Sequence, residues 1–136
     1  MNITASRPVP VGYHWFFLVA ALYDMVLGAL FVVAGESILR AIGMALPPHV
    51  AYIELAAIFI FIQGLGYWLV YRDPWANLGL VRMGVAYKAG YAGLAFYYLA
   101  IGKLPSLFFI PWAIIDVLFL LGFVMFLRLA ARPAEA

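Results

Sequence analysis

The fold is decided first by residues 13 to 35, which read YHWFFLVAALYDMVLGALFVVAG. A helix that crosses a lipid bilayer needs about 20 mostly apolar residues. This stretch is long enough, and Asp24 is the only Asp, Glu, Lys or Arg in it. Because backbone groups in lipid must form their hydrogen bonds within the same segment, the stretch is predicted to be a transmembrane helix.

The composition of the whole chain supports a membrane protein. Of its 136 residues, 68% are hydrophobic and only 10% are charged, whereas soluble domains are about 45–50% apolar and about 25% charged. A domain of this size keeps much of its surface exposed, so it cannot hide so many apolar side chains in a core. The lipid bilayer is therefore the first partner that the sequence predicts.

Three further stretches have the length and composition of membrane spans, at residues 50–71, 78–101 and 107–131. All four are too long for the strands of a membrane barrel, which run about 9–11 residues. The predicted fold is all-α: a single polytopic domain over residues 1–136, built as a four-transmembrane-helix bundle. A short amphipathic helix over Glu36 to Leu46 is expected at the membrane interface between the first two spans.

The flanking basic residues predict the orientation, because Lys and Arg gather on the cytoplasmic side. Arg40 and Lys103 flank one side of the predicted bundle, and more basic residues flank the other. These are Arg7, Arg72, Arg82, Arg128 and Arg132. Both termini are therefore predicted to be cytoplasmic.

Three charged residues stand near the middle of three different spans. These are Asp24, Lys88 and Asp116. A charge at the centre of a bilayer costs about 2.5–3.5 kcal/mol on insertion scales and usually marks a functional site. Placing Lys88 between the two aspartates, inside the bundle, offsets most of that cost. We therefore expect an Asp–Lys–Asp cluster at the midplane as the candidate ligand or proton site.

Other polar side chains are predicted near this cluster. Gln63 comes to a similar depth on the second span, and three tyrosines supply hydroxyl groups nearby; these are Tyr23, Tyr87 and Tyr91. Glu54 stands about one turn into the second span. It is expected either to pair with Arg40 at the interface or to mark the mouth of a pocket leading down to the cluster.

The cluster has two interpretations. It binds a ligand, a proton or a partner, or it only fixes how four apolar helices pair. Polar contacts between membrane helices are worth about 0.6 kcal/mol on average, which is small beside the insertion cost. The third span also carries the small-residue pairs Ala86–Gly90 and Ala89–Gly93. They are expected either in the crowded centre of the bundle or on a homodimer face.

The chain lacks the residues that several classes of chemistry require. The chain has no cysteine, and its two histidines, His14 and His49, fall at opposite membrane faces in the predicted topology. No metal site and no cofactor are therefore predicted. The basic residues are few and scattered, which argues against nucleic acid as a partner.

The plan resembles the DoxX-like class of small bacterial four-helix membrane proteins. The likeness rests on size, four spans and a few short patterns: Tyr23-Asp24 with Gly28, Gly64-x-Gly66, Arg72-Asp73-Pro74, and Asp116 in the last span. It implies a location in the bacterial inner membrane and a supporting role in a larger membrane complex. A more distant likeness is to the sterol-isomerase and sigma-two-receptor group, from which Lys88 among the carboxylates is a departure.

Three functions remain open from the sequence. The preferred one is a non-enzymatic protein that binds a small lipophilic molecule or serves as an accessory subunit. The second is proton-coupled transport of a small solute, since buried acids with a lysine are common in transporters. The third is an enzyme that modifies a lipid or quinone, with a protonated aspartate as general acid.

Overall fold

The computed structural model describes residues 8–132, so Arg7 of the orientation argument lies outside the described residues. Four helices follow one another along this part of the chain, and it contains no strand. Their bounds agree closely with the predicted spans, except at the end of the first. They are α1 (Val11–Ala41), α2 (Ala51–Arg72), α3 (Leu78–Ala100) and α4 (Phe109–Ala130).

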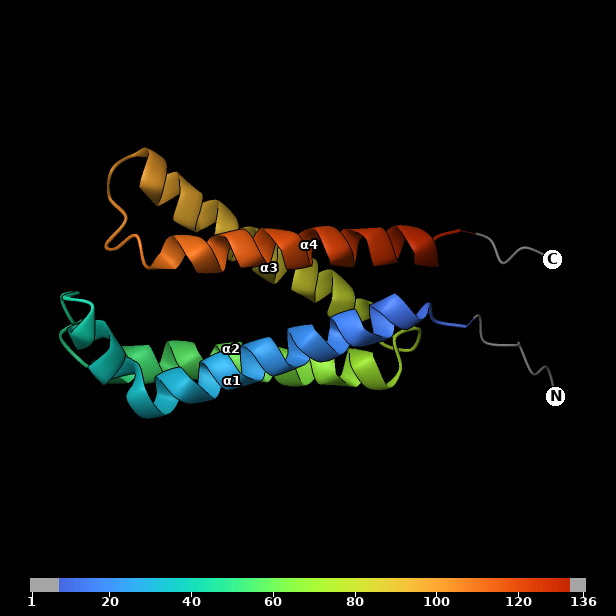
Figure 1. Ribbon diagram of the computed structural model, residues 1–136, viewed down its shortest axis with the longest axis horizontal. Helices are drawn as coiled ribbons and strands as arrows, with labels where there is room; N and C mark the ends of the chain where they lie inside the picture. Colours follow the sequence, from blue (N-terminus) through green and yellow to red (C-terminus); the bar gives the residue numbers. More distant parts are fainter. Residues whose placement is uncertain (1–7, 133–136) are drawn as a thin grey trace.

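The helices form two antiparallel hairpins, α1 with α2 and α3 with α4 (Figure 1). Two glycines let α1 and α2 approach closely. A Cβ atom on Gly28 would lie 2.5 Å from the backbone nitrogen of Phe61, and one on Gly64 would lie 2.6 Å from the backbone nitrogen of Met25. Small residues of this kind commonly allow close backbone approach between membrane helices.

The two hairpins meet in a core of aromatic and aliphatic side chains. Phe17 of α1 stacks on Phe123 of α4, with ring centroids 5.9 Å apart, and Tyr67 of α2 lies 4.9 Å from the same ring. This core lies toward the start of α1 and the end of α4, which share one end of the molecule (Figure 1). The hairpins are thus joined firmly at that end.

The outer surface of the bundle is largely apolar. Large hydrophobic side chains are exposed along every helix, including Val33 at 86% and Phe59 at 68% exposure. Three helices, α1, α2 and α4, are long and apolar enough to cross a membrane. The remaining helix, α3, has a similar length but is less apolar than the others. A surface of this kind is stable only against lipid or another apolar partner.

The prediction of a separate helix over Glu36 to Leu46 is wrong. Glu36 to Ala41 continue α1 without a break, and the chain then turns at Gly43, whose φ of 70° favours glycine. The final turns of α1 do change direction relative to the rest of the helix (Figure 1). Leu39 is buried there and Arg40 is exposed, so this segment keeps the amphipathic character that the sequence indicates.

The small-residue pairs of α3, Ala86–Gly90 and Ala89–Gly93, do not lie in a crowded centre. Ala86, Ala89, Gly90 and Gly93 are exposed, and a Cβ atom on either glycine would meet nothing within 4 Å. The buried face of α3 instead carries residues at helical spacing: Val81, Gly84, Lys88, Ala92 and Ala95. The small-residue pairs therefore form an outer face of the described bundle.

Candidate functional site

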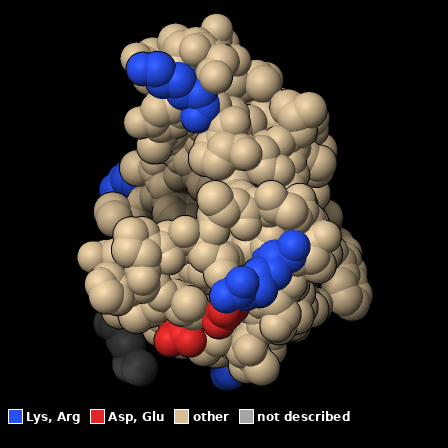
Figure 2. Space-filling view, turned by 90° about the vertical axis from the view of Figure 1, so that its left-hand side faces the viewer, with Lys and Arg blue, Asp and Glu red and all other residues tan. Residues whose placement is uncertain are grey.

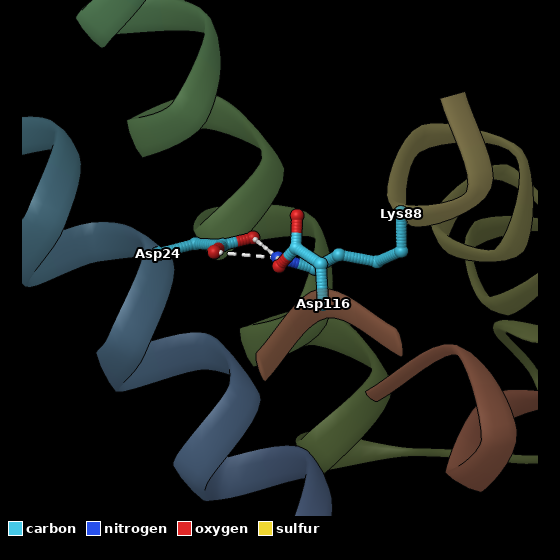
Figure 3. A network of polar contacts seen from close by, with 3 residues as sticks. All are labelled: Asp24, Lys88 and Asp116. Atoms are coloured by element: carbon cyan, nitrogen blue, oxygen red, sulfur yellow. Dashed lines mark hydrogen bonds and ion pairs between the residues drawn. The ribbon is translucent and has the colours of Figure 1, made fainter. Parts of the chain in front are cut away.

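Asp24, Lys88 and Asp116 meet between the two hairpins, as the sequence predicts. Each belongs to the buried stripe of its helix: Asp24 in α1, Lys88 in α3 and Asp116 in α4. The Lys88 side chain extends from α3 toward the two carboxylates (Figure 3). Exposure is 1% for Asp24, 1% for Lys88 and 4% for Asp116.

The two aspartates contact Lys88 in different ways. Lys88 Nζ donates hydrogen bonds to Asp24 Oδ1 at 2.8 Å and Oδ2 at 3.0 Å. Asp116 Oδ1 also lies 2.8 Å from Lys88 Nζ, but this ion pair lacks hydrogen-bond geometry. Within residues 8–132 that oxygen is buried without a hydrogen-bond partner. Asp24 is thus the main partner of the lysine, and Asp116 keeps acceptor capacity.

Four aromatic rings surround the Lys88 ammonium group. Its Nζ atom lies 5.1 to 5.8 Å from ring centroids on all four helices. A cation within about 6 Å of an aromatic face is attracted by the ring, more strongly when water is excluded. The rings belong to Tyr23, Tyr67, Tyr87 and Phe119. Their attraction for the cation offsets part of the hydration that the buried ammonium group has lost.

A cavity of about 530 Å³ leads to this cluster. It runs between the hairpins from the loops at residues 44–47 and 105–109 to the three charged side chains. Figure 2 looks onto this loop end and shows a hollow in it. The walls are mostly apolar, and the volume lies in the range of about 300–1,000 Å³ that is typical of small-molecule sites.

One wall of the cavity is a chain of aromatic side chains. Phe31 lies 6.4 Å from Phe108, Phe108 lies 5.8 Å from Trp112, and Trp112 lies 6.1 Å from Tyr23. The chain thus connects the loop end with the charged cluster. All four residues line the cavity.

The other predicted site residues fall into two groups. Tyr23, Tyr87 and Tyr91 line the cavity beside the cluster. Gln63 is half-buried on α2 but does not line the cavity. Both expectations for Glu54 are wrong: it is exposed and is not part of the cavity wall, while Arg40 pairs with a different acid.

The partner of Arg40 is Glu36, four residues earlier on α1, with Arg40 Nη2 2.7 Å from Glu36 Oε1. This pair is exposed, so its contribution to stability is small. Glu54 lies on α2, so the loop that joins α1 to α2 separates it from Arg40 along the chain. The i,i+4 spacing on a single helix gave Arg40 a nearer acid.

Sequence reasoning missed several residues of the site. Trp112 is not among the predicted site residues, yet it lines the cavity. It stands four residues before Asp116, so both lie on one face of α4, and this spacing could have indicated its role. Tyr67 is fully buried and its ring faces Lys88, with Nζ 5.8 Å from the ring centroid.

The described residues contain no group of three His, Cys, Asp or Glu side chains that could hold a metal ion. His14 packs against Tyr71 at the end of α2, with ring centroids 4.4 Å apart. His49 precedes α2 and lies near Tyr52, at the opposite end of that helix. The two imidazoles therefore lie at opposite ends of the bundle.

Comparisons of the chain with protein-family models, with curated proteins and with solved structures give no match. The likeness to the DoxX-like class therefore stays a prediction from the sequence. The candidate site has to be interpreted from its own geometry: an apolar cavity that ends at a buried cluster of two acids and one base.

Proposed function

We propose that this protein is a non-enzymatic membrane protein that binds one lipophilic small molecule in the cavity between its hairpins. The observation that carries the proposal is the cavity of about 530 Å³ whose inner end holds Asp24, Lys88 and Asp116. Ligand sites typically combine apolar walls with a few convergent polar groups that fix orientation. This cavity has that combination.

The alternative, a cluster that only fixes helix pairing, has less support. Gly28 and Gly64 already fix the close approach of α1 and α2. The stacked rings of Phe17 and Phe123 join α1 to α4. Buried ion pairs are often no more stabilising than apolar packing of the same volume. Helix pairing alone therefore gives little reason to keep three charges in an apolar bundle.

We further propose that α3 is the fourth membrane span. It has 23 residues, about 34 Å of helix, which is enough to cross the hydrocarbon core. Lys88 lowers its hydropathy but is buried against α1 and α4 rather than turned to lipid. Exposed positions on α3 include Met83 and Leu94. The cluster would then lie near the midplane, with the last turns of α1 at the interface.

The proposed location is the inner membrane of a bacterium, with both termini in the cytoplasm. Arg72, Arg82, Arg128 and Arg132 lie toward the end of the bundle where α1 begins and α4 ends. Arg40 and Lys103 lie toward the opposite end. This imbalance follows the positive-inside rule.

Two cysteine substitutions test the topology, because the natural chain contains no cysteine. Ala76 and Lys103 are exposed at opposite ends of α3. An impermeant maleimide should label Lys103→Cys in intact spheroplasts and Ala76→Cys only after the membrane is permeabilised. Labelling of both sites from the same side would show that α3 does not cross the membrane.

Binding is tested by purification in mild detergent, followed by mass spectrometry of the molecules that accompany the protein. Ala56 lines the cavity and is exposed, so Ala56→Trp should obstruct the cavity without disturbing the core. A lipophilic compound should accompany the natural protein at about one molecule per protein chain, and it should be absent from purified Ala56→Trp. Equal small-molecule content in both would contradict the proposal. A co-purifying protein alone would favour the accessory-subunit role.

A further inference from the structure

We infer that the ligand of this cavity is a cationic amphiphile, with an amine head group paired to Asp116 and a hydrocarbon tail directed toward the loop end. This inference rests on the proposed function, because it assigns the chemical class of the molecule bound at the same site. Its basis is the difference between the two aspartates. Asp24 accepts two hydrogen bonds from Lys88, whereas Asp116 contacts Lys88 through a single ion pair at 2.8 Å.

The charge count favours a cation. With Asp24 and Asp116 both ionised and Lys88 protonated, the three paired groups carry a net charge of −1. An uncompensated charge in a medium of low dielectric constant is costly. A bound ammonium group would neutralise the cluster. A fatty-acid carboxylate would add a second negative charge beside it.

The geometry leaves Asp116 available to such a head group. One of its carboxylate oxygens points away from Lys88 (Figure 3). The other, Oδ1, lies 2.8 Å from Lys88 Nζ, in an ion pair without hydrogen-bond geometry. The residue is 4% exposed and belongs to the cavity wall. An ionised carboxylate only accepts hydrogen bonds, so the group that completes it must be a donor.

The aromatic wall also suits a cation. Tyr91 and Trp112 line the cavity but are not among the four rings that surround Lys88. Trp112 lies on the same face of α4 as Asp116, one turn away. An ammonium group at Asp116 would therefore have aromatic faces nearby, and the attraction between a cation and an aromatic face increases when water is excluded.

The rest of the cavity accommodates an apolar tail. Between the cluster and the loop end its wall is made of hydrocarbon and aromatic side chains, among them Leu27, Phe31, Ile60 and Phe108. The loop end adds Met44 and Leu46. A molecule with one polar end and one apolar end thus has a single favourable orientation, with its head at Asp116.

The test compares three molecules with the same chain and different heads: dodecylamine, 1-dodecanol and dodecanoic acid. Binding is measured by titration calorimetry on protein in lipid nanodiscs. Nanodiscs that contain Ala56→Trp supply the heat of partitioning into lipid, which is subtracted. Asp116→Asn is the matched variant: it keeps the shape of the side chain and leaves Lys88 paired with Asp24.

The natural protein should bind dodecylamine at least about tenfold more tightly than dodecanol, because a charge-assisted hydrogen bond is stronger than a neutral one. Dodecanoic acid should bind most weakly. Asp116→Asn should remove the preference for the amine and still bind dodecanol, which shows that the cavity remains intact.

Each other result has a definite meaning. Equal affinity for the amine and the alcohol, or an amine preference that survives in Asp116→Asn, would overturn the head-group assignment and leave the proposed function standing. Preference for the acid would assign the head group to Lys88 instead. If none of the three molecules bound above the level of Ala56→Trp, both the assignment and the proposed function would fail.

Discussion

Replacing Lys88 with methionine removes the only positive charge of the buried cluster while keeping a side chain of similar length. The structure leaves the two carboxylates nothing to replace it. Asp24 loses both of its hydrogen bonds from Nζ, at 2.8 and 3.0 Å, and Asp116 loses its ion pair at 2.8 Å. Both acids are at least 96% buried, with exposures of 1% and 4%, so water cannot compensate.

The expected loss is large. Removing one partner of a buried ion pair costs about 3–5 kcal/mol, because the remaining charge stays uncompensated. Attraction between the ammonium group and the four surrounding rings is lost as well. By the scaling of soluble domains, a loss of this size lowers the unfolding temperature by about 10 °C or more.

The assay is thermal unfolding in dodecyl maltoside, followed by circular dichroism. The control is a triple variant that combines Lys88→Met with Asp24→Asn and Asp116→Asn. It contains no buried charge, so it should recover much of the lost stability. Unfolding of Lys88→Met at the same temperature as the natural protein would refute the reasoning. So would a triple variant that is less stable than Lys88→Met alone.

Three further predictions concern the charged cluster, the α1–α2 contact and the aromatic core. Asp24→Asn should lower the free energy of unfolding more than Asp116→Asn does, because Asp24 accepts both hydrogen bonds from Lys88; equal losses in detergent unfolding would contradict the division of roles. Gly28→Ala should destabilise the hairpin and Gly90→Ala should not, since only the first Cβ meets backbone atoms; the comparison of their unfolding temperatures decides this. Phe123→Ala should lower the free energy of unfolding by about 3–5 kcal/mol through the loss of core packing. A loss of less than about 1 kcal/mol would argue against a tight core.

The helices and the charged cluster were predictable from the sequence because each depends on a strong local cost. An apolar run of span length has to satisfy its backbone groups internally, and this fixed the predicted helices. Charges such as Lys88 in those runs have to find partners, which required Asp24 and Asp116 to meet. The end of α1 was less predictable. The apolar run ends at Gly35, and the sequence does not show whether the amphipathic residues after it form a separate helix or continue α1, as they do to Ala41.

The position and the walls of the cavity could not be predicted from the sequence. They depend on how the two hairpins diverge toward the loop end, which no residue pattern specifies. A tryptophan near the end of a span is typical of an interfacial anchor, and the sequence does not show whether Trp112 faces lipid headgroups or lines a cavity. Glu54 was expected near Arg40 on depth alone, but depth does not say which side of a helix a residue occupies.

The geometry of the cluster can be measured directly in a bilayer by solid-state nuclear magnetic resonance. The chain has only two lysines, Lys88 and Lys103, so a ¹⁵N-lysine label with Lys103→Arg isolates the Lys88 ammonium nitrogen. With ¹³C at the aspartate carboxyl carbons, its signal should be strongly dephased by two carboxylates, and Asp116→Asn should remove only part of this effect. A Lys88 signal that shows no dephasing would contradict the buried cluster on which the proposed site depends.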